Sequence, residues 1–164
     1  MMNYPFTEEE ARVAYDEWGC NCGPTALAFA LQTSLDVTRR LIADFDQKRY
    51  TSPAMMLDAL IASGRQWRDI RPVDASRMFQ VGPSLVRIQW TGPWTQPGAN
   101  PKWAYRQTHW ITTFLVERQA AMVFDVNGGI MGFQRWQSEI VPLILKSYPR
   151  SDGGWHPTHI WTIC

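Results

Sequence analysis

The chain has 164 residues, a formal net charge of +1 and 45% hydrophobic residues. This length favours a single domain over residues 1–164, large enough to bury a core. The near-neutral charge argues against partners such as nucleic acid or an anionic membrane surface, and no apolar run is long enough to span a bilayer. Three cysteines are too few, and odd in number, for a disulfide framework, which favours a reducing compartment.

The first part of the chain, residues 1–66, is predicted to be helical. Thr7 and Glu10 have the spacing of a capping box, so a helix should begin there and run to about Glu17, with Gly19 ending it. Val13 should face inward, with Tyr15 or Trp18 as a second inward residue. Apolar residues at helical spacing, with cap residues before them, predict further helices over about 22–33, 36–45 and 53–63.

The second part, about residues 80–164, is predicted to be rich in strands. Alternating apolar residues and turn signals place strands near 84–90, 108–116, 120–126, 129–134 and 159–163, with a helix over 136–146 kinked at Pro142. Helices first and antiparallel strands later indicate an α+β fold. Residues 91–107 are rich in proline and glycine and too long for a plain connection, so we expect this loop to border a binding site.

The segment 18–28 reads WGCNCGPTALA and contains a candidate nucleophile. Pro24 suits the first turn of a helix, so Cys22 falls at the helix N-terminus, where the helix dipole and free N–H groups favour a thiolate. Cys20 lies two residues farther out and is expected to keep the ordinary thiol pKa of about 8.5. The alternative is that Cys22 is a small apolar residue closing a helix cap.

Two further residues supply the partners that a nucleophilic thiol needs. His109 lies at the start of one predicted strand and Asp125 at the end of the next, and these positions are neighbours in an antiparallel pair. An imidazole could take the proton of Cys22 while a carboxylate orients the imidazole. Asn127 is the alternative orienting residue, although Asn127-Gly128 also reads as a hairpin turn.

These stretches together resemble the papain-like cysteine peptidases. The resemblance rests on Cys22-Gly-Pro-Thr, the strand at 82–88, His109-Trp110 and Phe124-Asp125, in that order, and is greatest to the bacteriocin-processing type that cleaves leader peptides after a double glycine. It implies a papain-like domain, a Cys22–His109–Asp125 triad, a peptide or protein substrate, and no metal or other cofactor. Such enzymes place a Gln shortly before the cysteine for the oxyanion, whereas residues 15–18 here are YDEW. The nearest amide is Asn21, beside the backbone N–H of Cys22.

The nine tryptophans suggest a second feature of the site. Trp94 and Trp103 lie in the loop before His109, and Trp110 follows it directly, so all three are candidates to line a substrate cleft. Tryptophan also serves in core packing, which is the competing interpretation for each of them.

We therefore expect a cysteine hydrolase that cleaves a peptide or amide bond through a thioester. The alternatives are an acyltransferase or deamidase with the same triad, or a non-catalytic binding module of papain-like shape. A weaker possibility is a zinc site formed by Cys20, Cys22, His156 and His159. The N-terminus lacks the pattern of a signal peptide, so the expected location is the cytoplasm, or a target cell if the protein is a delivered effector.

Overall fold

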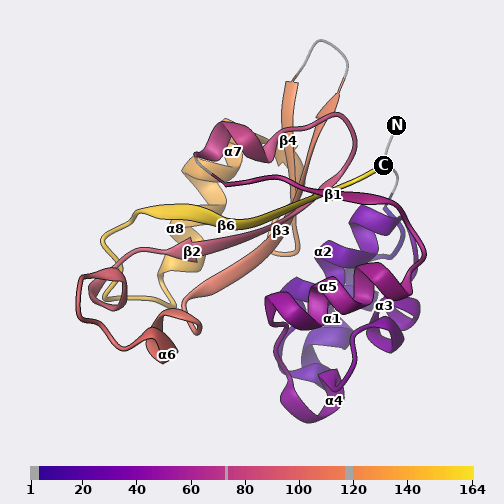
Figure 1. Cartoon of the computed structure of the whole chain (residues 1–164), viewed down its shortest axis with the longest axis horizontal. Coiled ribbons are helices and arrows are strands. Elements are labelled where there is room, and N and C mark those ends of the chain that lie inside the picture. The colour runs from indigo at the N-terminus through magenta and orange to yellow at the C-terminus, as the bar shows by residue number, and fades with distance from the viewer. Residues whose placement is uncertain (1–3, 73, 117–119) are drawn as a thin grey trace.

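The computed structural model describes residues 4–72, 74–116 and 120–164. In this part of the chain the fold is of the mixed α+β type, as the sequence predicts: helices form the first part, and an open antiparallel sheet of six strands forms most of the rest. Figure 1 shows α1 to α5 gathered at one end of the molecule, beside the sheet.

The helical part begins where the sequence places it. Thr7 Oγ1 accepts from the Glu10 N–H at 3.1 Å, and the Glu10 carboxylate accepts from the Thr7 N–H at 2.6 Å, which completes the capping box. Val13 is 39% exposed, contrary to expectation, whereas Trp18, one of the two alternatives, is buried together with Ala11 and Ala14. The helices are α1 (Glu8–Trp18), α2 (Cys22–Leu31), α3 (Leu35–Leu41), α4 (Phe45–Lys48) and α5 (Pro53–Ala62).

The sheet has the strand order β1-β6-β2-β3-β4-β5 in the part of the chain described. Its strands are β1 (Trp67–Asp69), β2 (Ser84–Trp90), β3 (Thr108–Val116), β4 (Ala120–Asp125), β5 (Gly129–Gly132) and β6 (Trp155–Ile163). The short edge strand β1 is not predicted from the sequence, because three residues are too few to show alternation. It forms by pairing with the end of the chain, where Trp67 lies opposite Ile163.

Short helical segments fill the connections between these strands. They are η1 (Ala75–Met78), η2 (Pro93–Thr95), α6 (Pro101–Ala104), α7 (Phe133–Arg135), the π-helical turn η4 (Trp136–Ile140) and α8 (Val141–Leu145). The predicted helix over 136–146 is thus the pair η4 and α8. Pro142 lies in the first turn of α8, where its missing N–H is tolerated.

The sheet separates two hydrophobic cores. On one face, Leu85, Trp110 and Phe124 pack with the side chains of α1 to α5. On the other face, Val86 and Ile111 pack with side chains from η1, η4 and α8. The alternation of side chains along β2 and β3 assigns neighbouring residues to opposite cores, which explains why β2 is buried along its whole length.

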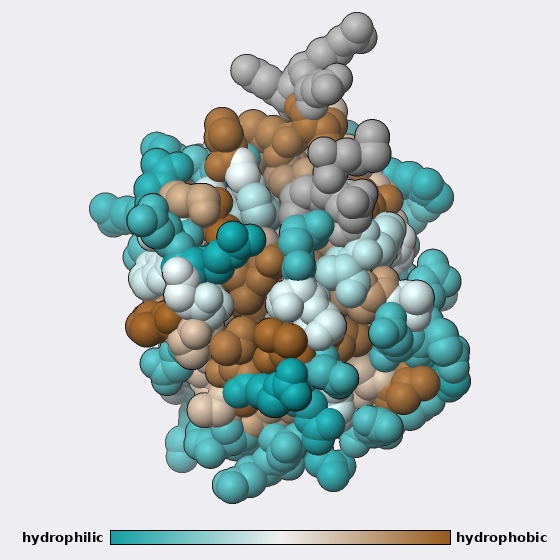
Figure 2. Space-filling model, turned by 90° about the vertical axis from the view of Figure 1, so that its right-hand side faces the viewer, coloured by the Kyte–Doolittle hydropathy of each residue, from teal (hydrophilic) through white to brown (hydrophobic). Residues whose placement is uncertain are grey.

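No helix in the described ranges has both the length and the apolar character needed to cross a membrane. The face shown in Figure 2, the right-hand side of Figure 1, carries hydrophilic residues around its rim and apolar residues toward its middle.

Candidate active site

Cys22 is the first residue of α2, with Asn21 as the N-cap. The start of this helix is fixed by Thr25, whose N–H and hydroxyl both donate to the Asn21 carbonyl, at 2.9 and 2.8 Å. Gly23 allows the segment just before α5 to approach closely, because a Cβ at this position would clash with the side chain of Thr51. The Cys22 side chain therefore stands at the positive end of a short, well-anchored helix.

His109 and Asp125 meet across the β3–β4 pair, as the sequence predicts. Thr112 lies opposite Phe124, so the next pair would place Asp125 opposite Ile111, which shares a face of β3 with His109. Nε2 of His109 lies 3.0 Å from Oδ2 of Asp125, and both side chains are buried. Nδ1, the other ring nitrogen, is not engaged by Asp125. The side chains of Cys22 and His109 line the same cavity, and each shifts the pKa of the other.

The Asp125 carboxylate is held by three further donors that we did not predict. Oδ2 accepts from Trp136 Nε1 at 2.8 Å. Oδ1 accepts from the backbone N–H and the side-chain amide of Asn127, at 2.9 and 3.0 Å. Asn127 therefore supports Asp125 rather than taking its place beside the imidazole. The bond from the Asn127 N–H to the Asp125 side chain is typical of an Asx turn and could be predicted from the turn sequence. Nothing in the sequence near Trp136, in η4, indicates that its ring reaches Asp125.

The ionisation of the three side chains is mutually coupled. Burial disfavours the charged form of each. For Cys22, the interaction with His109 and with the backbone N–H of Trp110 outweighs burial, so the pKa of Cys22 is lowered. Burial likewise opposes the imidazolium, and the charges of Asp125 and Cys22 overcome it and raise the pKa of His109 to about 10. The pKa of Asp125 is lowered despite burial by His109, Trp136 and Asn127. This combination favours a thiolate–imidazolium pair.

Cys20 differs from Cys22 more than the sequence suggests. Its thiol donates to the Arg49 carbonyl at 2.8 Å. Burial, together with the nearby charge of Cys22, raises the pKa of Cys20 to about 11, whereas we expected an unperturbed thiol. Cys20 is therefore held as a neutral thiol close to Cys22.

Arg87 is a buried cation near this site that the sequence analysis did not single out. It is 4% exposed on β2, donates from Nη1 to Thr158 Oγ1 at 3.1 Å, and stacks over the Tyr105 ring at 5.4 Å. In the described part of the chain, no carboxylate forms an ion pair with it. Burial lowers the pKa of Arg87, and the electrostatic influence of Tyr105 and Cys22 acts in the opposite direction.

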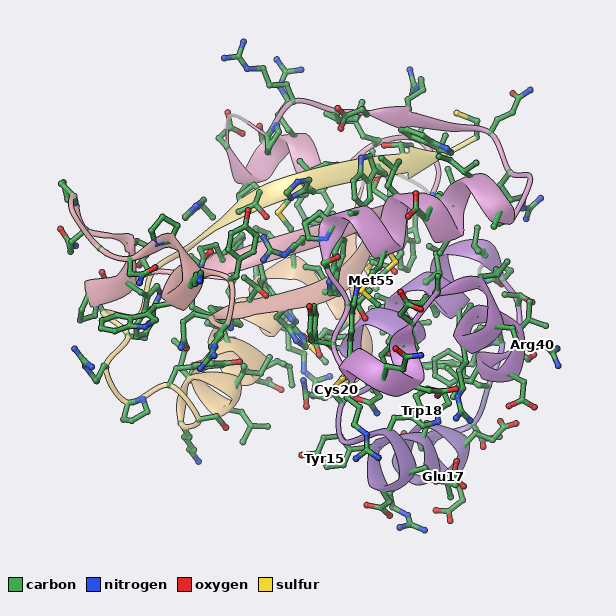
Figure 3. The ribbon with its side chains drawn as sticks, turned by 60° about the horizontal axis from the view of Figure 1, so that its bottom comes forward. Tyr15, Glu17, Trp18, Cys20, Arg40 and Met55 are labelled. Carbon is green, nitrogen blue, oxygen red and sulfur yellow. The ribbon has the colours of Figure 1, made fainter. Side chains whose placement is uncertain are left out.

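Cys22 and His109 open onto a cavity of about 830 Å³, which we call the Cys22 cleft. One wall comes from α1 and the Cys20–Cys22 segment, and the other from the β4–β5 turn and the residues at the end of α8. In Figure 3, Tyr15 and Cys20 lie on the side of the helical part that faces the α8 region, while Arg40 points away from it. Asn21 lines this cleft, but its Nδ2 donates to the Ala11 carbonyl at 2.8 Å, so one of its two N–H groups is already engaged.

The three candidate cleft tryptophans have different environments. Trp110 is a core residue: it is 2% exposed, stacks on Trp161 and donates from Nε1 to the Thr51 carbonyl at 3.0 Å. Trp94 and Trp103 line a second cavity of about 520 Å³, which we call the Trp103 pocket. The described residues that line the Cys22 cleft include none of the three. Trp110 faces the helical core, and Trp94 and Trp103 line the neighbouring pocket, so the expectation that these three tryptophans line the Cys22 cleft is wrong.

No group of three or more His, Cys, Asp or Glu side chains in the described ranges is arranged to hold a metal ion. The alternative zinc site thus lacks its cluster. His156 and His159 instead lie on β6, opposite Gln89 and Arg87 of β2.

No protein-family model matches the chain, and a search of curated proteins finds no match. The residues and geometry of the site itself are therefore what bear on the function of this protein.

Proposed function

We propose that this protein is a cysteine hydrolase that cleaves a peptide or amide bond through a Cys22–His109–Asp125 triad. The observation that carries the proposal is the arrangement at the helix N-terminus: Cys22 begins α2 and lines one cleft with His109, whose Nε2 lies 3.0 Å from Asp125 Oδ2. A thiolate, a protonated base and a buried orienting carboxylate are the three groups that nucleophilic acyl transfer needs.

In the proposed reaction the Cys22 thiolate attacks the carbonyl carbon of the substrate, and the C=O electron pair moves to the oxygen. The backbone N–H of Cys22, at the start of α2, is the proposed donor to this oxyanion, with the second N–H of Asn21 as a candidate helper. The imidazolium of His109 then protonates the leaving amine as the C–N bond breaks. This leaves a thioester on Cys22 and a neutral imidazole.

Water completes the cycle. His109 takes a proton from the water molecule as its oxygen attacks the thioester carbonyl. Collapse of the second tetrahedral intermediate expels the Cys22 thiolate, releases the carboxylic acid and restores the ion pair with His109. If an amine replaces water, the same intermediate gives acyl transfer, and if the substrate is a glutamine side chain, it gives deamidation.

Incubation of a proteome with the wild-type protein and with Cys22→Ala, followed by N-terminal profiling, tests the proposal. We expect new N-termini with the wild type and with a Cys20→Ser control, and none with Cys22→Ala. Loss of His109 should reduce the rate by about 10²–10⁴-fold, as for other general acid–base residues. Identical profiles for the wild type and Cys22→Ala, with no mass change of one unit on glutamine and no new amide, would instead support a binding module.

A further inference from the structure

The Trp103 pocket adjoins the Cys22 cleft. Ser147 and Tyr148, which follow α8, line both cavities. The Tyr148 ring lies 6.2 Å from the Trp90 ring, and Trp90 stacks on His109 at 6.3 Å. The wall between the two cavities is therefore connected to the candidate base through the Trp90 ring.

The floor of the Trp103 pocket is rigidly built. Trp94 is 8% exposed, and its Nε1 donates to the Trp90 carbonyl at 2.7 Å. Gly92 allows close packing here, because a Cβ would lie 2.8 Å from the Trp94 ring and 3.0 Å from the Arg150 carbonyl. Ser151 Oγ adds a bond to the Thr91 carbonyl at 2.8 Å, which ties the loop to the segment after α8.

Trp103 has a different environment from Trp94. It belongs to the single turn α6, whose N-cap Asn100 accepts from the Lys102 N–H at 3.0 Å, and its own side chain is 59% exposed. A large aromatic side chain held at the rim of a pocket and left in water is typical of a binding surface, since burial of its ring by a ligand is favourable.

The charge around this pocket is mainly positive, and Asp152, an acid just after the lining segments, accepts a hydrogen bond from the Thr91 hydroxyl. The two segments that line it, residues 91–107 and 141–150, contain Lys102, Arg106, Lys146 and Arg150 and no Asp or Glu. All four cations are exposed, and Arg150 lines the pocket itself. Such a rim attracts acidic groups and disfavours basic ones.

We propose that the Trp103 pocket is a subsite for an aromatic side chain in an acidic stretch of the polypeptide substrate. The proposal deepens the proposed function, because the same substrate chain passes Ser147 and Tyr148 to reach Cys22. An extended peptide advances about 3.3 Å per residue, so the aromatic residue lies a few positions from the bond that reacts. The aromatic ring packs on Trp103 and Trp94, and acidic neighbours face the cations of the rim.

Peptides that carry an iodoacetyl group test this subsite through the alkylation rate of Cys22. Two series are needed, with the electrophile at the amino or the carboxyl end of the peptide, because either chain direction is compatible with the two cavities. Each series contains Glu-Phe-Glu, Glu-Ala-Glu and Lys-Phe-Lys segments at increasing distance from the electrophile. We expect Glu-Phe-Glu to react about tenfold faster than Glu-Ala-Glu in one series, the scale expected for burial of an aromatic ring.

The readout is this Phe-to-Ala rate ratio, which cancels any general change in the reactivity of the thiol. Trp103→Ala should reduce the ratio by at least about threefold, and Ile61→Ala, an exposed apolar control on α5, should not. Arg150→Glu should reduce the preference for Glu-Phe-Glu over Lys-Phe-Lys by about two- to fivefold, whereas reversal of the exposed Arg40 should leave it unchanged. A ratio near one in both series, or one that Trp103→Ala leaves intact, would overturn the subsite.

Binding without reaction separates this proposal from that of the hydrolase. Fluorescence anisotropy with a fluorescein-labelled peptide containing Glu-Phe-Glu, measured on Cys22→Ala with and without Trp103→Ala, reports on the pocket alone. Weaker binding after loss of Trp103, in a protein that cleaves nothing in the proteome experiment, would keep the subsite and reject the hydrolase. Cleavage of proteome substrates, together with an affinity and a rate ratio that Trp103→Ala leaves unchanged, would support the hydrolase and reject the subsite.

Discussion

The side-chain amide of Asn127 donates to Oδ1 of Asp125 at 3.0 Å, while Oδ2 of the same carboxylate faces His109. From the sequence, either Asp125 or Asn127 could orient the imidazole. In the structure Asp125 contacts His109, and Asn127 in turn donates to Asp125. Asp125 is fully buried, so each donor on it bears on its charge and thereby on the charge of His109.

Replacement of Asn127 by Ala should weaken the network without abolishing it, because the backbone N–H of residue 127 remains. The lowered pKa of Asp125 means that its stabilising contribution is present above the ordinary value of 3.8 and is lost as the pH falls through the lowered pKa. Asn127→Ala raises that folded-state pKa, so acid unfolding should begin at a higher pH. Urea unfolding against pH measures this, with Asn100→Ala as a control at an exposed helix cap.

Trp136→Phe should also raise the folded-state pKa of Asp125, because it removes a donor to Oδ2 of the carboxylate. The ring keeps its packing in the core, but the Nε1 donor to Oδ2 is lost, at a cost of about 1.5–3 kcal/mol for a hydrogen bond to a charged group. A less stable carboxylate anion also supports the imidazolium less, so the raised pKa of His109 should fall. Titration of the His109 ring by NMR measures this, and Trp67→Phe at the edge of the sheet should leave the titration unchanged.

Alkylation by iodoacetamide should distinguish the two neighbouring thiols. The pKa of Cys22 is lowered and that of Cys20 is raised to about 11, so one thiol should react well below the pH of about 8.5 at which a free cysteine titrates. Cys22→Ser and His109→Ala should each remove this reactivity, while Cys20→Ser should retain it. Rates measured against pH, with the modified residue identified by mass spectrometry, provide the test. Loss of the fast thiol in Cys20→Ser alone would move the site to Cys20.

Gly129→Ala should destabilise the turn beside the cleft for two separable reasons. Gly129 has φ +74°, and a Cβ there would lie 2.4 Å from the hydroxyl of Tyr4, which accepts from the Ile130 N–H. Gly64 has φ +68° with nothing within 4 Å, so Gly64→Ala carries only the backbone term of about 1–2 kcal/mol. We expect the free energy of unfolding to fall more for Gly129→Ala, and equal losses would show that Tyr4 moves aside freely.

Trp94→Ala and Trp103→Ala should differ in stability although both residues line one pocket. Trp94 is nearly buried, and its truncation should cost about 3–5 kcal/mol, as for large core residues. Trp103 is mostly exposed, and its truncation should change the free energy of unfolding by less than about 0.5 kcal/mol. Thermal and urea unfolding measure both. A large loss for Trp103→Ala would assign it a packing role rather than a binding role.

The sequence by itself determined the features that depend on neighbouring residues. The capping box of α1, the left-handed Gly19 at its end and the position of Cys22 at the start of α2 follow from residues within one helical turn. The strand alternation at 108–116 and 120–126 also brought His109 and Asp125 together, because antiparallel pairing makes the start of one strand the neighbour of the end of the next.

Only the tertiary structure decided the features that depend on residues far apart in the chain. Trp136 reaches Asp125 from η4, and the side of β3 that faces the helices makes Trp110 a core residue rather than part of the cleft. The environment of Cys20 depends on Arg49 from a separate helix end, and the Trp103 pocket exists because the 91–107 loop packs on the segment after α8. Periodicity shows which faces of an element are apolar, but the partner of each face is chosen by packing of the whole chain.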